Sequence, residues 1–327
     1  MEIGTKVLER RISNSSLDWI RLGPRVFKMM WDRELIKTST TSLDLGSAVH
    51  CYILEPERFK EDYVVLDASV KPVGGLMGEF IRAVNAFHIS LLPGDELTTE
   101  DYQNVANAVG FKLKLPQILE DYQKPKYDAY KASLKEAHGK QVISVEDMNT
   151  IQAIQQSIIN HKLANKLMYG TEDWDIIEAE SRQDGVVHGK YKSINAVGII
   201  DRLLINHKTK EIVIVDLKTT SDSVYLFNSS YNKYQYDRQM AFYYDMLKDQ
   251  YPDYDIEVYM VVVQTTYATH TTDCAVYNID DLELEKGRIK YKLLLDKVSW
   301  HMSKDIWDYP QEYYESNGLC LLNQSRQ

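Results

Sequence analysis

Two neighbouring runs of apolar residues near the middle of the chain give the clearest structural signal in the sequence. Residues 196–205 and 212–215 are rich in β-branched side chains that favour strands, and polar residues 207–210 lie between them. This pattern predicts a β-hairpin. If its turn consists of these four polar residues, Asp201 lies directly opposite Asp216.

The charged residues of this hairpin interrupt strands that otherwise read as buried. Because side chains alternate along a strand, Asp216 and Lys218 share a face while Leu217 points the other way into packing. Asp201 joins them only if the register holds. A desolvated pair of carboxylates needs a cation, and Mg²⁺ or Mn²⁺ is the usual partner of oxygen ligands. The alternative is a surface hairpin with solvated charges, which the apolar runs disfavour.

The elements on either side of the hairpin add further polar candidates. The preceding strand places Glu178 and Glu180 on one face, either in an acidic cluster or toward solvent. After the hairpin, a long helix is expected from about residue 232 to 248. Gln239 and Tyr243 lie four residues apart and therefore project from the same side of that helix.

A histidine in the N-terminal third is a less certain candidate. Small and apolar residues surround His50 on a helix predicted over residues 42–56. A lone histidine in such a helix is more often a satisfied core residue than a ligand. Its pattern alone therefore does not assign it to a site.

In combination, Asp201, the run Asp216-Leu217-Lys218, and the pair Gln239 and Tyr243 resemble the PD-(D/E)XK nuclease superfamily. The resemblance is to the branch that contains the RecB-type nuclease domain and phage λ exonuclease. It is closer still to the RecE-like (exodeoxyribonuclease VIII) family of phage and prophage recombination exonucleases. It covers roughly residues 11–60 and 140–310.

The resemblance implies an α/β (α+β) fold, in which a restriction-endonuclease-like core has a central mixed sheet flanked by helices. We expect a single domain over residues 1–327. Within it, residues 1–140 form a mostly helical N-terminal part that carries His50, and residues 141–310 form the catalytic core.

The resemblance also implies roles for individual residues. Lys218 would steady the nucleophile or the scissile phosphate, and Gln239 and Tyr243 would orient water or contact DNA. In the family a glutamate before the hairpin completes the acidic cluster, which favours Glu180 over Glu178. The expected metal ligands are His50, Glu180, Asp201, Asp216 and the carbonyl of Leu217.

The activity that follows is metal-dependent hydrolysis of linear double-stranded DNA from its ends, 5′ to 3′, which leaves 3′ overhangs. The expected partners are duplex ends, a phage single-strand annealing protein, and further copies of the chain in a ring. Two other classes stay open. One is a PD-(D/E)XK nuclease of other polarity, acting on single strands or as an endonuclease in defence, and the other is a non-catalytic DNA-binding module.

Composition narrows these classes. The net charge of −10 argues against tight non-specific DNA binding, since phosphate contacts need Lys and Arg. Three cysteines cannot hold the four-cysteine iron–sulfur cluster of some relatives. The sequence has no phosphate-binding loop of the Walker type, so any degradation is expected to be ATP-independent. No apolar run is long enough for a membrane span, and we expect a cytoplasmic, phage- or prophage-encoded protein in a bacterial host.

Overall fold

The chain divides into two compact units. The computed structural model describes residues 10–32, 45–66, 70, 73–91, 95–137, 139–266 and 272–319. The first unit comprises Met1–Lys37, Ser157–Gln264 and Asp273–Gln327, and the second comprises Thr38–Gln156 and Thr265–Thr272. These boundaries differ from the predicted division at residue 140, because the N-terminal residues group with the strands of the first unit. That the chain forms a single domain stays a prediction.

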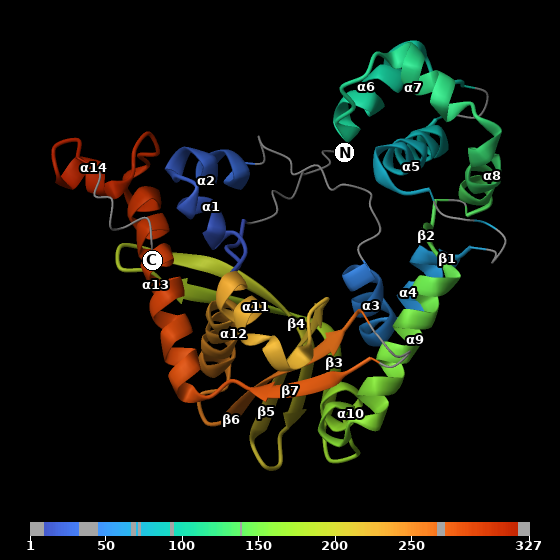
Figure 1. The fold of residues 1–327 in the computed structure, drawn as a ribbon. Helices are drawn as coiled ribbons and strands as arrows, with labels where there is room; N and C mark the ends of the chain where they lie inside the picture. The colour runs from blue at the N-terminus through green and yellow to red at the C-terminus, as the bar shows by residue number, and fades with distance from the viewer. Residues whose placement is uncertain are drawn as a thin grey trace, which may run out of the picture. The chain divides into compact units, whose positions relative to one another are not determined.

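A five-stranded mixed sheet forms the centre of the first unit (Figure 1). Neighbouring strands are antiparallel except β5 and β6, which are parallel. A parallel pair needs a crossover connection, which here contains α11 (Asn228–Tyr234) and α12 (Tyr236–Gln250). In spatial order the strands are β3 (Ile176–His188), β4 (Ser193–Asn206), β5 (Glu211–Thr220), β6 (Asp255–Gln264) and β7 (Cys274–Asn278).

Helices cover both faces of this sheet, as predicted. On one face, α12 and α13 (Asp281–Lys304) pack against each other, and Ile214 of β5 and Phe242 of α12 both lie fully buried in the main core. Val213 alternates with Ile214 and faces the other way. There it lines a hollow with Leu167 of α10 (Lys162–Tyr169), a helix that contacts β4, β5 and β7.

The N-terminal segment of the described chain joins the first unit. Ile12 is fully buried and forms an isolated parallel bridge with Ala196 of β4. The short helices α1 (Leu17–Arg21) and α2 (Pro24–Trp31) follow. Phe27 of α2 stacks on Trp31 and also on Trp307, which follows α13, so the two ends of the described chain share one aromatic cluster. The short helix α14 (Gln311–Glu315) comes last.

The second unit is mostly helical. Its two short strands, β1 (Tyr63–Val65) and β2 (Gln141–Ile143), pair in parallel. Among its described residues, one cluster of buried side chains lies around Phe80 and Ile118 and another around Ile81 and Tyr130. Its helices are α3 (Leu45–Leu54), α4 (Pro56–Asp62), α5 (Gly75–Ser90), α6 (Thr99–Val109), α7 (Leu115–Tyr122), the 3₁₀ turn Pro125–Tyr127, α8 (Asp128–Glu136) and most of α9 (Val145–Asn160).

The helix expected over residues 232–248 is in fact two helices. The chain breaks between α11 and α12 at Gln235, whose φ of 54° lies in the left-handed region that a regular helix does not use. Gln239 and Tyr243 both lie on α12, so their shared face is unaffected. Among the residues that the structure describes, no helix is long and apolar enough to cross a membrane.

Candidate active site

The β4–β5 hairpin holds its two acids in the register that its turn predicts. The Cα partners of the two strands run up to Arg202 and Val215, so the next positions are Asp201 and Asp216. Beyond this last pair, Oδ2 of Asp201 accepts a hydrogen bond of 2.7 Å from the backbone N–H of Leu217. The predicted register is therefore confirmed, and Asp201 is tied to the strand that carries Asp216.

Asp216 and Lys218 form a buried ion pair on one face of β5. The Asp216 side chain is 1% exposed, and Nζ of Lys218 lies 2.6 Å from its Oδ2. The ammonium also lies 5.1 Å from the ring centroid of Tyr236, whose face attracts a cation. Burial opposes the charged ammonium, but Asp216 and Asp201 outweigh it and raise the pKa of Lys218. Lys218 is therefore positively charged at neutral pH.

Asp201 carries a carboxylate whose surroundings disfavour its negative charge. Burial raises its pKa from 3.8 to about 6, and the nearby charge of Glu180 acts in the same direction. Lys218 and the N–H of Leu217 act in the opposite direction without cancelling the effect. A cation beside Asp201 would favour the charged form, because opposite charges at short range lower a carboxyl pKa.

Strands β3 and β4 change the face that they present to the core at Glu180 and Asp201. On β4, Ile200 and Leu203 belong to the same core although they are three residues apart, which strict alternation does not allow. On β3, Glu180 has a φ of 47°, an uncommon left-handed value for a residue other than glycine, and the Cα pairing with β4 skips it. A carboxylate oxygen of Glu180 lies within 4.8 Å of one of Asp201.

The same irregularity bears on the choice between the two glutamates. Glu178 is exposed and accepts a hydrogen bond from the hydroxyl of Ser181, which regular alternation would put on the opposite face. The alternation that placed Glu178 and Glu180 on one face is therefore interrupted between them. The structure places Glu180 beside Asp201 and pairs Glu178 with a neighbour on its own strand.

Gln239 of α12 links the helix to the acids of the hairpin. Its Nε2 donates to Oδ1 of Asp216 at 3.2 Å and to the hydroxyl of Tyr243 at 3.1 Å. Burial, followed by the charge of Asp216, raises the pKa of Tyr243 to about 12, so the phenol keeps its proton. Gly198 leaves room for this ring, since a Cβ there would lie 2.9 Å from it. The prediction that Gln239 and Tyr243 project from the same side of the helix is therefore confirmed, and the Gln239 amide is directed at Asp216.

For two other predicted site residues, His50 and Leu217, the role as a metal ligand stays a prediction. His50 lies on α3 of the second unit with a half-buried side chain, whereas the acids belong to the first unit, and its role as a ligand stays a prediction. The start of its predicted helix, residues 42–44, lies outside the described residues. The side chain of Leu217 is fully buried, as expected, and ligation through its carbonyl stays a prediction.

The donors within the first unit suit a hard divalent cation. Glu180 and Asp201 offer carboxylate oxygens within 4.8 Å of each other, the ligand type that Mg²⁺ and Mn²⁺ prefer. Asp216 lies on the neighbouring strand and is bonded to Lys218 and Gln239. Lys218 lies against Asp216, whereas burial and the nearby charge of Glu180 raise the pKa of Asp201. The chemistry of this donor set therefore fits a magnesium or manganese ion.

Sequence reasoning missed two residues around this cluster. Tyr236 lies against the ammonium of Lys218, and Arg238 is a buried cation next to Gln239. Tyr236 precedes Gln239 by one helical turn, and this spacing was a usable signal. No pattern marks Arg238, because a charged residue in an amphipathic helix normally faces solvent.

Comparison with known proteins places the chain in a family. No curated protein matches its sequence. The solved structure of a "Putative exonuclease" from Eubacterium rectale is similar over 97% of this chain and 88% of its own, with 9% identity and a TM-score of 0.47. That of SSO0001 is similar over 68% of this chain and 87% of its own, with 10% identity and a TM-score of 0.25. A family model described as a PDDEXK-like domain of unknown function (DUF3799) matches residues 26–315, and the chain belongs to this family.

Proposed function

We propose that this protein is a divalent-metal-dependent nuclease that hydrolyses phosphodiester bonds at the ends of linear double-stranded DNA. The observation that carries the proposal is the group of charged residues on the hairpin of a PDDEXK-like domain. Nζ of Lys218 lies 2.6 Å from Oδ2 of Asp216, and Asp201 accepts a hydrogen bond from the backbone N–H of Leu217, the residue between them. A largely buried lysine beside these acids suits hydrolysis of a phosphodiester, because negative charge develops in its transition state.

In this proposal Asp201, Asp216 and Glu180 hold Mg²⁺ or Mn²⁺. The carbonyl of Leu217, which the same strand carries, is a further ligand in this proposal, and so is the imidazole of His50, which the family resemblance implies. The metal supplies a water of lowered pKa and compensates charge on the phosphate. The ligand carboxylates must be ionised to bind it, and this requirement links activity to the raised pKa of Asp201.

The remaining residues position the substrate and the attacking water. Lys218 keeps its proton and offers a fixed point charge to the scissile phosphate or to the nucleophile. Gln239 holds Asp216 through its amide, and that amide is also within reach of the Tyr243 hydroxyl. Tyr243 keeps its proton and can therefore donate a hydrogen bond to a phosphate oxygen or to water.

The finer features rest on the resemblance to RecE-like exonucleases. We propose degradation of the 5′ strand, 3′ overhangs for recombination by single-strand annealing, a phage annealing protein as partner, and a ring of subunits around the duplex. Cytoplasmic action in a bacterial host, from a phage or prophage gene, belongs to the same proposal. The acidic net charge is compatible with it because bound metal ions change the charge of the site.

The test is digestion of linear duplexes that carry a label at either the 5′ or the 3′ end, beside a closed circular duplex. With Mg²⁺ or Mn²⁺ we expect early release of the 5′ label and an intact circle. Early release of the 3′ label would reverse the polarity, and cutting of the circle would indicate an endonuclease. Binding of duplex without hydrolysis would favour a non-catalytic DNA-binding module.

A further inference from the structure

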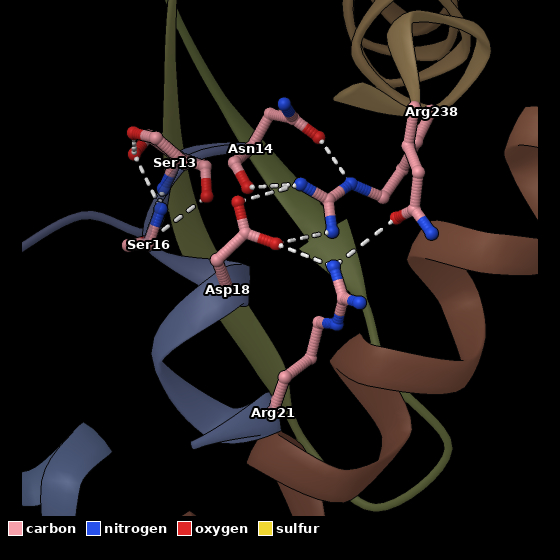
Figure 2. A network of polar contacts seen from close by, with 8 residues as sticks. Ser13, Asn14, Ser16, Asp18, Arg21 and Arg238 are labelled. Carbon is pink, nitrogen blue, oxygen red and sulfur yellow. Dashed lines mark hydrogen bonds and ion pairs between the residues drawn. The ribbon is translucent and has the colours of Figure 1, made fainter. Parts of the chain in front are cut away.

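Arg238 is a buried cation that connects the start of α12 to the N-terminal segment. Its side chain is 2% exposed, and its guanidinium reaches toward α1, as Figure 2 shows. Nη1 and Nη2 donate to the two carboxylate oxygens of Asp18 at 2.8 and 2.9 Å. Nε donates to Oδ1 of Asn14 at 3.0 Å. A bidentate pair of this kind fixes the orientation of both partners as well as their distance.

The energetics of this pair favour a role in orientation over one in stability. Burial tends to raise the pKa of Asp18, but Arg238 and then Arg21 outweigh it and lower that pKa. Asp18 is nevertheless 46% exposed, whereas Arg238 has lost nearly all of its hydration. A buried ion pair often gains little net stability, because desolvation offsets the attraction.

The first turn of α12 is also held from the side of α13. Asp237, the residue before Arg238, pairs with Lys290. At Gly287 a Cβ would lie 2.0 Å from the carbonyl oxygen of Asp237, so the backbones of the two helices are in direct contact there. The turn that begins after Gln235 therefore packs against α13 on one side and is bonded to the N-terminal segment through Arg238 on another.

Gln239 is the next residue in this turn. Its Nε2 lies 3.2 Å from Asp216, so a shift of the turn by about one ångström would break the contact. We propose that Arg238 is a positioning residue, whose ion pair with Asp18 holds the Gln239 amide against Asp216. The inference rests on the proposed nuclease function and adds to it a residue pair outside the metal-binding cluster.

A double-mutant cycle tests this coupling. Arg238→Ala is expected to lower kcat for duplex hydrolysis about 10-fold with little change in KM, because misplacement of a positioning group slows the chemical step. In a Gln239→Ala background the same change is expected to have no further effect. An equal loss in both backgrounds would overturn the proposal.

The matched control is Arg288→Ala. Arg288 also forms a bidentate ion pair with α12, through Asp245, but one to two turns beyond Gln239. We expect it to leave kcat nearly unchanged. If it lowers kcat as much as Arg238→Ala does, any ion pair on α12 would have the same effect and the proposal would be wrong.

A second readout does not depend on activity. In ¹⁵N-labelled full-length protein, the side-chain amide signal of Gln239 is identified by its loss in Gln239→Ala. Asp18→Asn and Arg238→Lys, which keep most of the packing, are expected to shift this signal, and Arg288→Lys to leave it in place. If the Gln239 signal stays in place in both variants, Arg238 does not position Gln239 and the proposal is wrong. If the signal shifts in the variants but the wild-type enzyme hydrolyses no DNA, only the proposed nuclease function is overturned.

Discussion

The substitution Asp201→Asn is expected to stabilise the metal-free protein at neutral and alkaline pH. Folding raises the pKa of this carboxyl from 3.8 to about 6, so the folded state holds its proton more tightly than the unfolded state. The contribution to stability is complete below pH 3.8 and is lost as the pH rises through about 6. A shift of about two pKa units corresponds to a loss of roughly 3 kcal/mol.

Asparagine removes the charge and keeps an oxygen that accepts the N–H of Leu217. Thermal unfolding in EDTA should therefore show a higher Tm for Asp201→Asn than for wild type at pH 8, and a smaller difference at pH 4.5. Mg²⁺ should raise the Tm of wild type more than that of the variant, because the proposed metal ligand is the Asp201 carboxylate. The exposed residue Asp255 supplies the control Asp255→Asn, for which little change is expected.

A variant that melts at or below the wild-type temperature at both pH values would refute this reasoning. The surroundings of Asp201 would then already stabilise its ionised form, and no bound cation would be needed to compensate its negative charge.

Three further changes test other parts of the structure. Lys218→Met should lower hydrolysis at least about 100-fold in kcat, as expected for loss of a charge aimed at the transition state, while gel-shift binding of duplex in Ca²⁺ persists; retained activity would exclude the lysine from the chemistry. Gly287→Ala should cost about 1–3 kcal/mol in urea unfolding, since its Cβ would meet the Asp237 carbonyl at 2.0 Å, and an unchanged midpoint would argue against that contact. Phe27→Ala should cost about 3–5 kcal/mol by the same assay, because the ring is fully buried between two tryptophans; a small loss would place the aromatic cluster outside the folding core.

The hairpin shows why part of the site was predictable from sequence. A short polar turn sets the register, and alternation then sets which side chains share a face. Those two rules placed Asp216 and Lys218 together, as the structure has them, and gave the register that the structure shows up to Arg202 and Val215, next to Asp201. The helical spacing of Gln239 and Tyr243 was equally local, and their hydrogen bond follows from it.

The features that escaped prediction depend on backbone conformations or contacts distant in sequence. Glu180 adopts a left-handed φ although the residue is not glycine, so the sequence gives no sign of it. Because of this conformation, Glu178 and Glu180 do not follow one regular alternation of faces. Gln235 breaks the expected helix in the same way, with neither glycine nor proline at the break. Arg238 forms its ion pair with Asp18, which lies 220 residues away in the sequence, and no local sequence pattern predicts a contact over that separation.

The proposed function depends most directly on whether the residues of the β4–β5 hairpin support hydrolysis of DNA. We would follow the release of acid-soluble nucleotides from linear duplex by wild type and by Asp216→Asn, each with Mg²⁺, with Mn²⁺ and with EDTA. We expect hydrolysis by wild type with a metal ion, none in EDTA, and a loss of at least about 100-fold in the variant. Duplex left intact by folded wild-type protein with both metals, or hydrolysis that survives Asp216→Asn, would contradict the proposal.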